Sequence, residues 1–169
     1  MYIYCQKGIK CPTDLNFLGK KRYVQRAGIV PFMIDDTGET FMLLGIAKDD
    51  KVFADLGGTT EKGETVLDTA IREYLEESRS VISADLNRTS KIFITRVYGN
   101  KKQAIMFVQV EPIQYNIDID DYFQATIPRN KYEDEMTELK WIRYKDFLTL
   151  PDSMLSKSMI MVRKLMLNV

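Results

Sequence analysis

Apolar residues recur along this chain in short β-prone runs, and turn signals separate the runs. The segments at 35–38 (Asp-Asp-Thr-Gly) and 99–102 (Gly-Asn-Lys-Lys) are typical of turns between paired strands. Two hairpins are therefore expected, over residues 23–47 and 91–111. The predicted strands span residues 2–5, 23–34, 40–47, 91–98, 104–111 and 139–143, with a short strand at 59–61.

Helical periodicity appears in the middle and at the end of the chain. A helix over residues 65–79 is predicted from an apolar stripe at i, i+3, i+4, i+7 and i+8, and Thr65 is a suitable N-cap. A second helix follows Pro151, and a helical turn is predicted at 144–148, whereas 112–131 is predicted to be a loop. The stripe of the first helix consists of Leu67, Ala70, Ile71, Tyr74 and Leu75.

Three glutamates on the first predicted helix are candidates for chemistry. Glu73, Glu76 and Glu77 fall at i, i+3 and i+4, which predicts that they share the face opposite the apolar stripe. Like charges at this spacing repel by about 0.2–0.5 kcal/mol per pair. A divalent cation would turn that repulsion into attraction, because hard cations bind carboxylate oxygens. A solvated acidic helix face is the other interpretation of these residues.

The residues before the helix favour the metal site. Gly57 and Gly58 are expected to form a turn that bends the backbone sharply and brings it close to a ligand. From Gly58 the chain has five residues, Glu64, seven residues, and then Arg-Glu-x-x-Glu-Glu over 72–77. This pattern resembles the signature of the Nudix hydrolases in order and spacing, and it is more specific than a lone glycine-rich loop.

Three positions depart from the family signature. Arg79 stands where the family has a glycine two residues after the paired glutamates, and Ser80 stands where an aliphatic residue is expected. Tyr74 also replaces a residue that is usually aliphatic. The missing glycine puts the geometry of the loop after the helix in question, but it leaves the candidate metal ligands intact.

The resemblance implies a three-layer α/β/α sandwich, within the class of α/β or α+β domains that the mixed sheet also indicates. It implies that Mg²⁺ or Mn²⁺ is bound by Glu73, Glu76 and Glu77 and by the backbone carbonyl of Gly57. The reaction it implies is hydrolysis of a phosphoanhydride by metal-activated water, without a covalent intermediate.

Roles in catalysis follow from the same resemblance. Glu73 or Glu76 would also be the base that takes the proton from water, with Glu73 slightly preferred. Arg72 would orient a ligand carboxylate. Glu64 would hold the junction between loop and helix or reach a second metal ion.

Residues outside the signature complete the predicted site. Glu133 and Glu135 precede the predicted strand at 139–143, where family members often carry a further carboxylate, and either would be a base or a late metal ligand. A solvated acidic loop is the alternative for both. The candidates for binding the leaving half of the substrate are Arg26, Phe53, Asp55 and Tyr132.

Composition narrows the chemistry and the compartment. The chain has no histidine, which excludes Ser-His and Cys-His nucleophilic catalysis and histidine-ligated zinc. Cys5 and Cys11 are the only cysteines, and they are expected to be reduced thiols in a cytoplasmic protein. No apolar run reaches about 18 residues, so no membrane span is expected.

Charge is balanced over the chain but unevenly distributed. The net charge is zero, yet residues 1–26 contain six basic residues and one acidic residue. This arm is interpreted either as a solvated surface or as an entrance for phosphates, and RNA is one such polyanionic partner.

The 169 residues are expected to form one domain, with an arm at 1–22 that carries a short strand and a Nudix domain over 23–169. A monomer or a homodimer is compatible with the sequence. The predicted substrate is a nucleotide or another pyrophosphate: an mRNA cap, ADP-ribose, a dinucleotide, a nucleoside triphosphate or an inositol pyrophosphate. Two alternatives are a catalytically weak module that binds a nucleotide or RNA, and a purely structural interaction protein.

Overall fold

An eight-stranded mixed sheet is the centre of the computed structural model, which describes residues 1–112 and 118–168. The strands are β1 (Tyr2–Cys5), β2 (Arg26–Ile34), β3 (Thr40–Ala47), β4 (Phe53–Ala54), β5 (Leu56–Thr59), β6 (Thr89–Tyr98), β7 (Lys101–Gln109) and β8 (Met136–Arg143). Their order is β1-β6-β7-β2-β3-β4, with β5 paired to β2 and β8 paired to β3.

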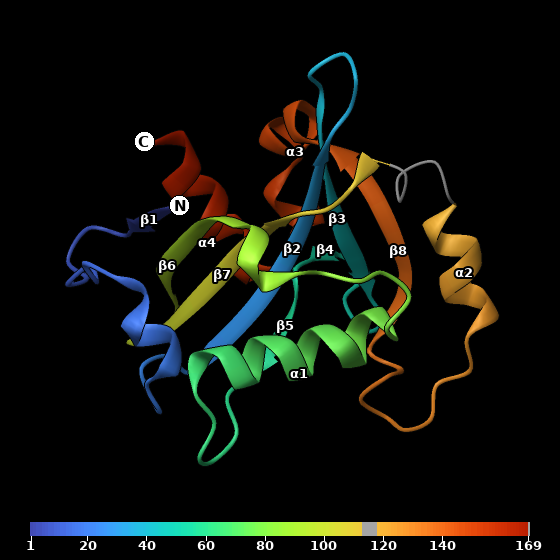
Figure 1. The fold of residues 1–169 in the computed structure, drawn as a ribbon. Coiled ribbons are helices and arrows are strands. Elements are labelled where there is room, and N and C mark those ends of the chain that lie inside the picture. Colours follow the sequence, from blue (N-terminus) through green and yellow to red (C-terminus); the bar gives the residue numbers. More distant parts are fainter. Residues whose placement is uncertain (113–117, 169) are drawn as a thin grey trace.

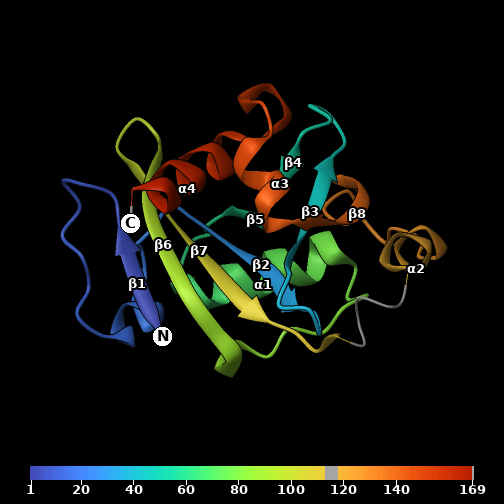
Figure 2. The same ribbon diagram turned by 90° about the horizontal axis from the view of Figure 1, so that it is seen from above.

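Helices cover both faces of this sheet (Figures 1 and 2). The helix α1 (Val66–Ser78) packs on β2 and β5, while α3 (Tyr144–Thr149) and α4 (Lys157–Leu167) lie on the opposite face. The sheet therefore separates two hydrophobic cores, which confirms the predicted α/β/α layers. Within the described residues, no helix has both the length and the apolar character needed to cross a bilayer.

Short helices complete the connections between these elements. The 3₁₀ turn η1 (Leu15–Gly19) contacts α1, and α2 (Ile119–Ala125) contacts β8. Two further 3₁₀ turns are η2 (Leu86–Arg88) and η4 (Asp152–Met154).

Both predicted hairpins are confirmed. Strands β2 and β3 pair antiparallel, with Phe32 opposite Met42, and β6 pairs antiparallel with β7 over most of its length. Strands β2 and β7 are parallel neighbours, which places Arg26 beside Gln103 at one end of the sheet. This end carries the candidate site.

The prediction of a loop over 112–131 is wrong in part, because α2 lies inside that range. Asp118 caps this helix by accepting hydrogen bonds from the backbone N–H groups of Asp120 and Asp121. Phe123 is fully buried and fixes the helix on the domain. Residues 113–117 of the predicted loop lie outside the described part of the chain.

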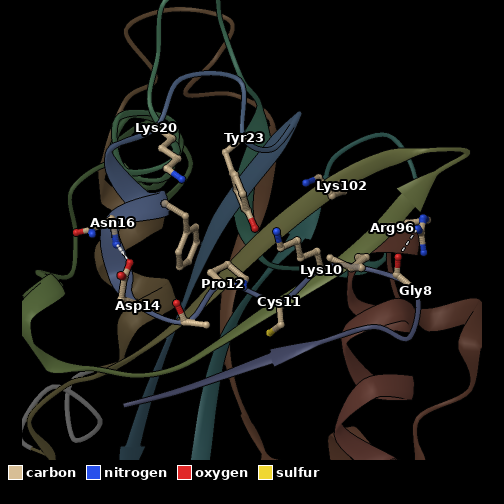
Figure 3. A pocket seen from close by; sticks show the side chains of 13 residues that line it. Gly8, Lys10, Cys11, Pro12, Asp14, Asn16, Lys20, Tyr23, Arg96 and Lys102 are labelled. Carbon is tan, nitrogen blue, oxygen red and sulfur yellow. Dashed lines mark hydrogen bonds between the residues drawn. The ribbon is translucent and has the colours of Figure 1, made fainter.

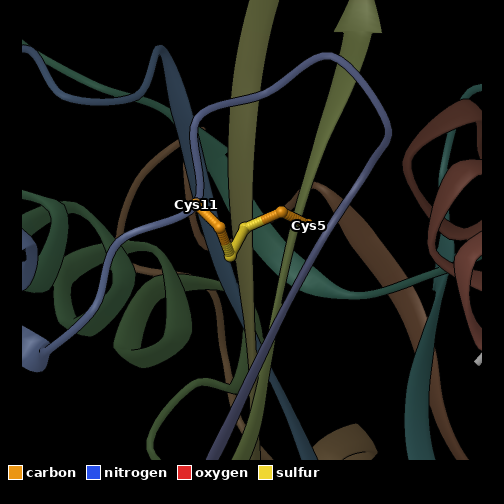
Figure 4. The surroundings of a disulfide bond; sticks show 2 residues. All are labelled: Cys5 and Cys11. Carbon is orange, nitrogen blue, oxygen red and sulfur yellow. A yellow bond between two sulfur atoms is a disulfide. The ribbon is translucent and has the colours of Figure 1, made fainter.

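The prediction of two reduced thiols is also wrong for this structure, in which Cys5 and Cys11 form a disulfide (Figure 4). Strand β1 pairs parallel with β6 and ends at Cys5, and the chain then turns back through Gly8, whose φ is +91°. The turn brings the two cysteine Cα atoms to 5.6 Å, within the range that a disulfide spans. The cysteines therefore no longer support a reducing compartment.

Candidate active site

The doubled glycine that opens the signature lies in a strand, so the predicted turn at these residues is wrong. Gly57 and Gly58 belong to β5 and pair with Gly28 and Ala27 of β2. Glycine is needed at both positions because a side chain would not fit. A Cβ atom on Gly57 would lie 2.5 Å from the Gly28 Cα, and one on Gly58 would lie 2.5 Å from the Glu73 carboxylate. The two glycines let α1 carry its carboxylates directly against the strand.

The predicted orientation of α1 is wrong in part: Ala70 and Tyr74 of the expected apolar stripe are buried, but so are two of the three glutamates predicted on the opposite face. Ile71 and Leu75 of the expected apolar stripe are 38% and 48% exposed, whereas Glu73 and Glu77 are only 8% and 4% exposed. The helix begins at a capping box formed by Thr65 and ends above the sheet, with the Tyr74 hydroxyl donating to the Ile82 carbonyl at 2.6 Å. Two glutamates thus lie on the buried side of the helix.

Three carboxylates converge beside β5. Ligand atoms of Glu73, Glu77 and Glu135 lie within 4.8 Å of one another, and the Gly57 N–H donates to Glu77 Oε2 at 3.0 Å. Burial, reinforced by the neighbouring Asp55 charge, raises the pKa of Glu77 well above its ordinary value. Desolvation likewise raises the pKa of Glu73, and it raises that of Glu135 although this residue is exposed overall. Three partly desolvated carboxylates in one place are costly unless protons or a cation neutralise them.

A divalent cation fits this group of ligands. Carboxylate oxygens are the donors that Mg²⁺ and Mn²⁺ prefer, and burial of the Glu73 and Glu77 carboxylates argues against an ordinary solvated acidic face. Glu76 is not one of the three converging carboxylates, and its Oε2 atom accepts a hydrogen bond from Arg72 at 3.4 Å. The structure thus brings Glu135 into the carboxylate group alongside two of the signature glutamates.

Arg72 connects the loop before α1 with the carboxylates. It donates to Glu64 at 2.7 and 3.0 Å, to Glu73 at 2.7 Å and to the Thr59 carbonyl at 2.9 Å. These hydrogen bonds lower the pKa of Glu64 to about 2 and raise the pKa of Arg72. Glu64 also accepts from the Glu61 N–H at 2.7 Å, so it holds the junction between loop and helix.

A buried ion pair forms the wall opposite α1. Arg26 donates to both carboxylate oxygens of Asp55, at 2.8 and 3.1 Å, and Asp55 is completely buried. The same guanidinium contacts the side chains of Gln103 and Ser158, at 3.3 and 3.1 Å. These two polar residues were not among the predicted site residues, because the pairing of β2 with β7 brings Gln103 to Arg26 and the packing of α4 on the sheet brings Ser158.

Two clefts meet at Arg26. One, of about 490 Å³, is lined by residues that include Asp55, Gly57, Glu77 and Glu135, so two members of the carboxylate group face it. The second, of about 660 Å³, extends the other way, and Thr59, Lys62, Tyr98 and Lys101 contribute to its lining. Arg26 lines both clefts.

Three predicted site residues do not line these clefts: Phe53 and Tyr132, predicted to bind substrate, and Glu133, predicted as a base or late metal ligand. Phe53 packs with the core on the α4 side, and its carbonyl accepts from the Ser156 N–H. Tyr132 is 44% exposed. The Glu133 carboxylate is paired with Arg129 at 2.7 Å.

The basic arm forms a separate pocket of about 660 Å³ (Figure 3). Four cationic side chains line it, and Asp14, its one acidic lining residue, caps the Asn16 N–H at 2.8 Å. Tyr23 contributes an aromatic ring, over which the Lys102 amine lies at 4.3 Å. The cationic residues are Lys10, Lys20, Arg96 and Lys102.

Comparisons with known proteins agree with this architecture. Residues 22–162 match the NUDIX domain family. Among solved structures, a MutT/nudix family protein from Listeria innocua has a TM-score of 0.52 at 12% identity, covering 88% of this chain and 94% of that chain. The NUDIX domain of Shewanella oneidensis NrtR, complexed with ADP ribose, has a TM-score of 0.51 at 14% identity, covering 89% and 90%. No curated protein matches the sequence.

The fold and the signature define this protein as a phosphoanhydride-cleaving hydrolase. The match spans most of the chain, and the chain therefore belongs to the NUDIX family. It is a Nudix pyrophosphohydrolase.

Proposed function

We propose that this protein uses Mg²⁺ or Mn²⁺ to hydrolyse the pyrophosphate linkage of a nucleoside diphosphate joined to another moiety. The convergence of the Glu73, Glu77 and Glu135 carboxylates beside the glycines of β5 carries this proposal. These carboxylates would hold the metal, with Glu76 and the Gly57 carbonyl as additional ligands.

The chain's own residues divide the work of the reaction. When bound, the metal supplies charge neutralisation at the phosphates and a more acidic water. Glu73 or Glu135 would take the proton from the attacking water, because each has a carboxylate in the group and desolvation raises the pKa of each. Arg72 holds the Glu73 carboxylate in a fixed orientation at 2.7 Å. Glu64 in turn fixes Arg72.

The two clefts suggest how the substrate lies. A pyrophosphate at the carboxylate group places one half of the substrate in the cleft with Tyr98, Lys62 and Lys101. The lysines of this cleft could bind further phosphates, and the exposed Tyr98 ring could stack on a nucleobase. Arg26 lies between the two halves and is held there by Asp55. A nucleoside diphosphate compound, as in the ADP ribose complex of the NrtR domain, matches this arrangement.

The pocket of the basic arm supports RNA as a second class of ligand. Four cations and one aromatic ring in a concave surface are typical of binding to a phosphate backbone. A capped RNA would then be the substrate, with its chain on the arm. Such binding falls steeply with salt, whereas hydrolysis of a small dinucleotide does not depend on the arm.

A hydrolysis screen tests these proposals. The panel contains ADP-ribose, dinucleoside polyphosphates, nucleoside triphosphates, inositol pyrophosphates and capped RNA, each with Mg²⁺, Mn²⁺ or EDTA and at two salt concentrations. We expect turnover only with metal, and a loss of at least about 100-fold in kcat for Glu77→Gln and for Glu73→Gln, since metal ligands matter more than the residues that orient them.

The control is Glu111→Gln, which removes an exposed carboxylate paired with Arg88 at 2.5 Å, far along the chain from the signature. This variant should retain full turnover. Full activity in both site variants would refute the metal centre. If the rate of capped-RNA cleavage did not change with salt concentration, RNA would be removed from the proposal and only the small nucleotides would remain as substrates.

A further inference from the structure

Arg79 occupies the position at which the family signature has glycine, and its backbone explains why glycine belongs there. The residue follows α1 as its C-cap with φ 51° and ψ 32°, in the left-handed region. This conformation is strained for a residue that carries a side chain and is not strained for glycine. The arginine side chain must therefore make contacts that offset the cost.

Those contacts all go to residues 123–136, from the C-terminal end of α2 to the first residue of β8. The Arg79 side chain is only 8% exposed, and its Nε atom donates to the Glu133 carbonyl at 2.8 Å. Its Nη2 atom donates to the Met136 carbonyl at 3.4 Å, and Nη1 donates to Thr126 Oγ1 at 3.2 Å. The guanidinium carbon also lies 4.0 Å from the centroid of the Phe123 ring. Figure 1 shows this segment beside the C-terminal end of α1.

Two of the carbonyls that accept from Arg79, those of Glu133 and Met136, lie on either side of Glu135 along the chain. Glu135 is exposed and belongs to a bend without regular structure, so its own packing does not fix its carboxylate beside Glu77. Backbone contacts at residues 133 and 136 limit where residue 135 can lie. The Lys48 N–H, which donates to the Glu135 carbonyl at 2.9 Å, adds a third constraint on the same turn.

We propose that Arg79 is a positioning residue that holds Glu135 in the metal-binding carboxylate group. Its guanidinium joins the end of the helix that carries Glu73 and Glu77 to the turn that carries Glu135. The proposal rests on the proposed function, since it requires that the carboxylate group bind a divalent metal. Residues that orient metal ligands typically contribute 10–100-fold to metal affinity.

Two variants separate the backbone of Arg79 from its side chain. Arg79→Ala removes the contacts and keeps the conformational cost, whereas Arg79→Gly removes both the contacts and the cost. We expect both variants to bind Mn²⁺ about tenfold more weakly, measured without substrate by electron paramagnetic resonance. Arg79→Gly should be the more stable of the two. Amide exchange at residues 133–136 should accelerate in both.

Arg163 provides a matched control. It is another buried arginine that donates to backbone carbonyls, those of Phe147 and Leu150 at 3.0 and 2.5 Å, and its guanidinium carbon lies 5.9 Å from the Phe147 centroid. It lies on α4, on the other face of the sheet from α1. Arg163→Ala should reduce stability while Mn²⁺ affinity and exchange at 133–136 stay within about twofold of the parent.

A double-mutant cycle shows whether Arg79 acts through Glu135. In the Glu135→Gln background, adding Arg79→Ala should change Mn²⁺ affinity by less than about twofold. An undiminished tenfold effect in that background, or an equal loss in Arg163→Ala, would overturn the positioning role. So would normal Mn²⁺ binding in both Arg79 variants. Failure of the parent protein to bind Mn²⁺ would instead defeat the metal centre itself, and the positioning role with it.

Discussion

The β5 backbone lies so close to the Glu73 carboxylate that the site should not tolerate a larger residue at Gly58. Gly58 has no positive φ in β5, so alanine meets no conformational obstacle there, yet its Cβ would lie 2.5 Å from Glu73. We expect Gly58→Ala to displace that carboxylate and to weaken Mn²⁺ binding at least tenfold. Overpacking of this kind also costs about 1–3 kcal/mol of stability. Titration with Mn²⁺ and urea unfolding measure the two effects.

Gly19 is the control for that substitution. A Cβ atom on Gly19 meets no atom within 4 Å, and its φ is not in the left-handed region. Gly19→Ala should therefore leave both metal affinity and stability nearly unchanged. Equal metal affinity in the two glycine variants would show that Glu73 adapts freely and is not held against β5.

The sequence identified these chemical groups but not how they are positioned. The signature singled out Glu73, Glu76 and Glu77, because it is a local pattern on one helix, and two of these three belong to the carboxylate group. Glu135 was one of two candidates in an acidic segment, and only the path of the chain between α2 and β8 separates it from Glu133, whose carboxylate pairs with Arg129. Gln103 and Ser158 reach Arg26 from elements far apart in the sequence, so no local sequence pattern could have predicted that they contact it.

The hydrophobic periodicity of the sequence predicted the positions of the main helices and strands better than it predicted which face of α1 is buried. Both hairpins and the start of α1 are where alternation and capping signals predict them. The orientation of α1 was wrong in part, because both of its faces mix apolar and charged residues. The glycines of β5 leave room for Glu73, and the Gly57 N–H donates to Glu77. The short α2 was missed because its seven residues give too little periodicity beside several acidic residues.

The N-terminus of α1 is expected to affect the site through the helix. Thr65 accepts from the Asp68 N–H at 3.1 Å, and the Asp68 carboxylate accepts from the Thr65 N–H at 3.0 Å. Thr65→Ala removes this cap and should cost about 0.5–2 kcal/mol of unfolding free energy. Since Glu64 and Arg72 are anchored at the same turn, Mn²⁺ affinity should fall as well, which calorimetry measures.

The corresponding cap of α4 distinguishes a local effect from a general loss of stability. Ser156 accepts from the Met159 N–H at 3.2 Å, and α4 carries none of the candidate metal ligands. Ser156→Ala should cost a similar unfolding free energy and leave Mn²⁺ affinity unchanged. A parallel loss of affinity in Ser156→Ala would mean that the site responds only to global stability.

At the scale of the whole molecule, the candidate site makes stability depend on pH in two opposite ways. Glu64 has a folded-state pKa lowered from 4.5 to about 2, so its contribution is present above pH 4.5 and is lost as pH falls toward 2. Glu77 has its pKa raised well above 4.5 by burial, and the pKa values of Glu73 and Glu135 are raised too. The contribution of these three is complete below pH 4.5 and is lost as pH rises through their folded-state values.

The metal-free protein should therefore be most stable in mildly acidic solution and lose stability from about pH 5 toward pH 8. Bound Mn²⁺ should reverse that trend, because it binds the ionised carboxylates and adds about 2.7 kcal/mol at a concentration of 100 Kd. Urea unfolding in EDTA and in Mn²⁺ at pH 5, 6.5 and 8 measures both curves. Glu77→Gln should flatten the EDTA curve, since glutamine keeps an acceptor for the Gly57 N–H without the charge. An EDTA curve that rises between pH 5 and 8 would show that these carboxylates are ionised at little cost, and their burial would then need no cation to balance it.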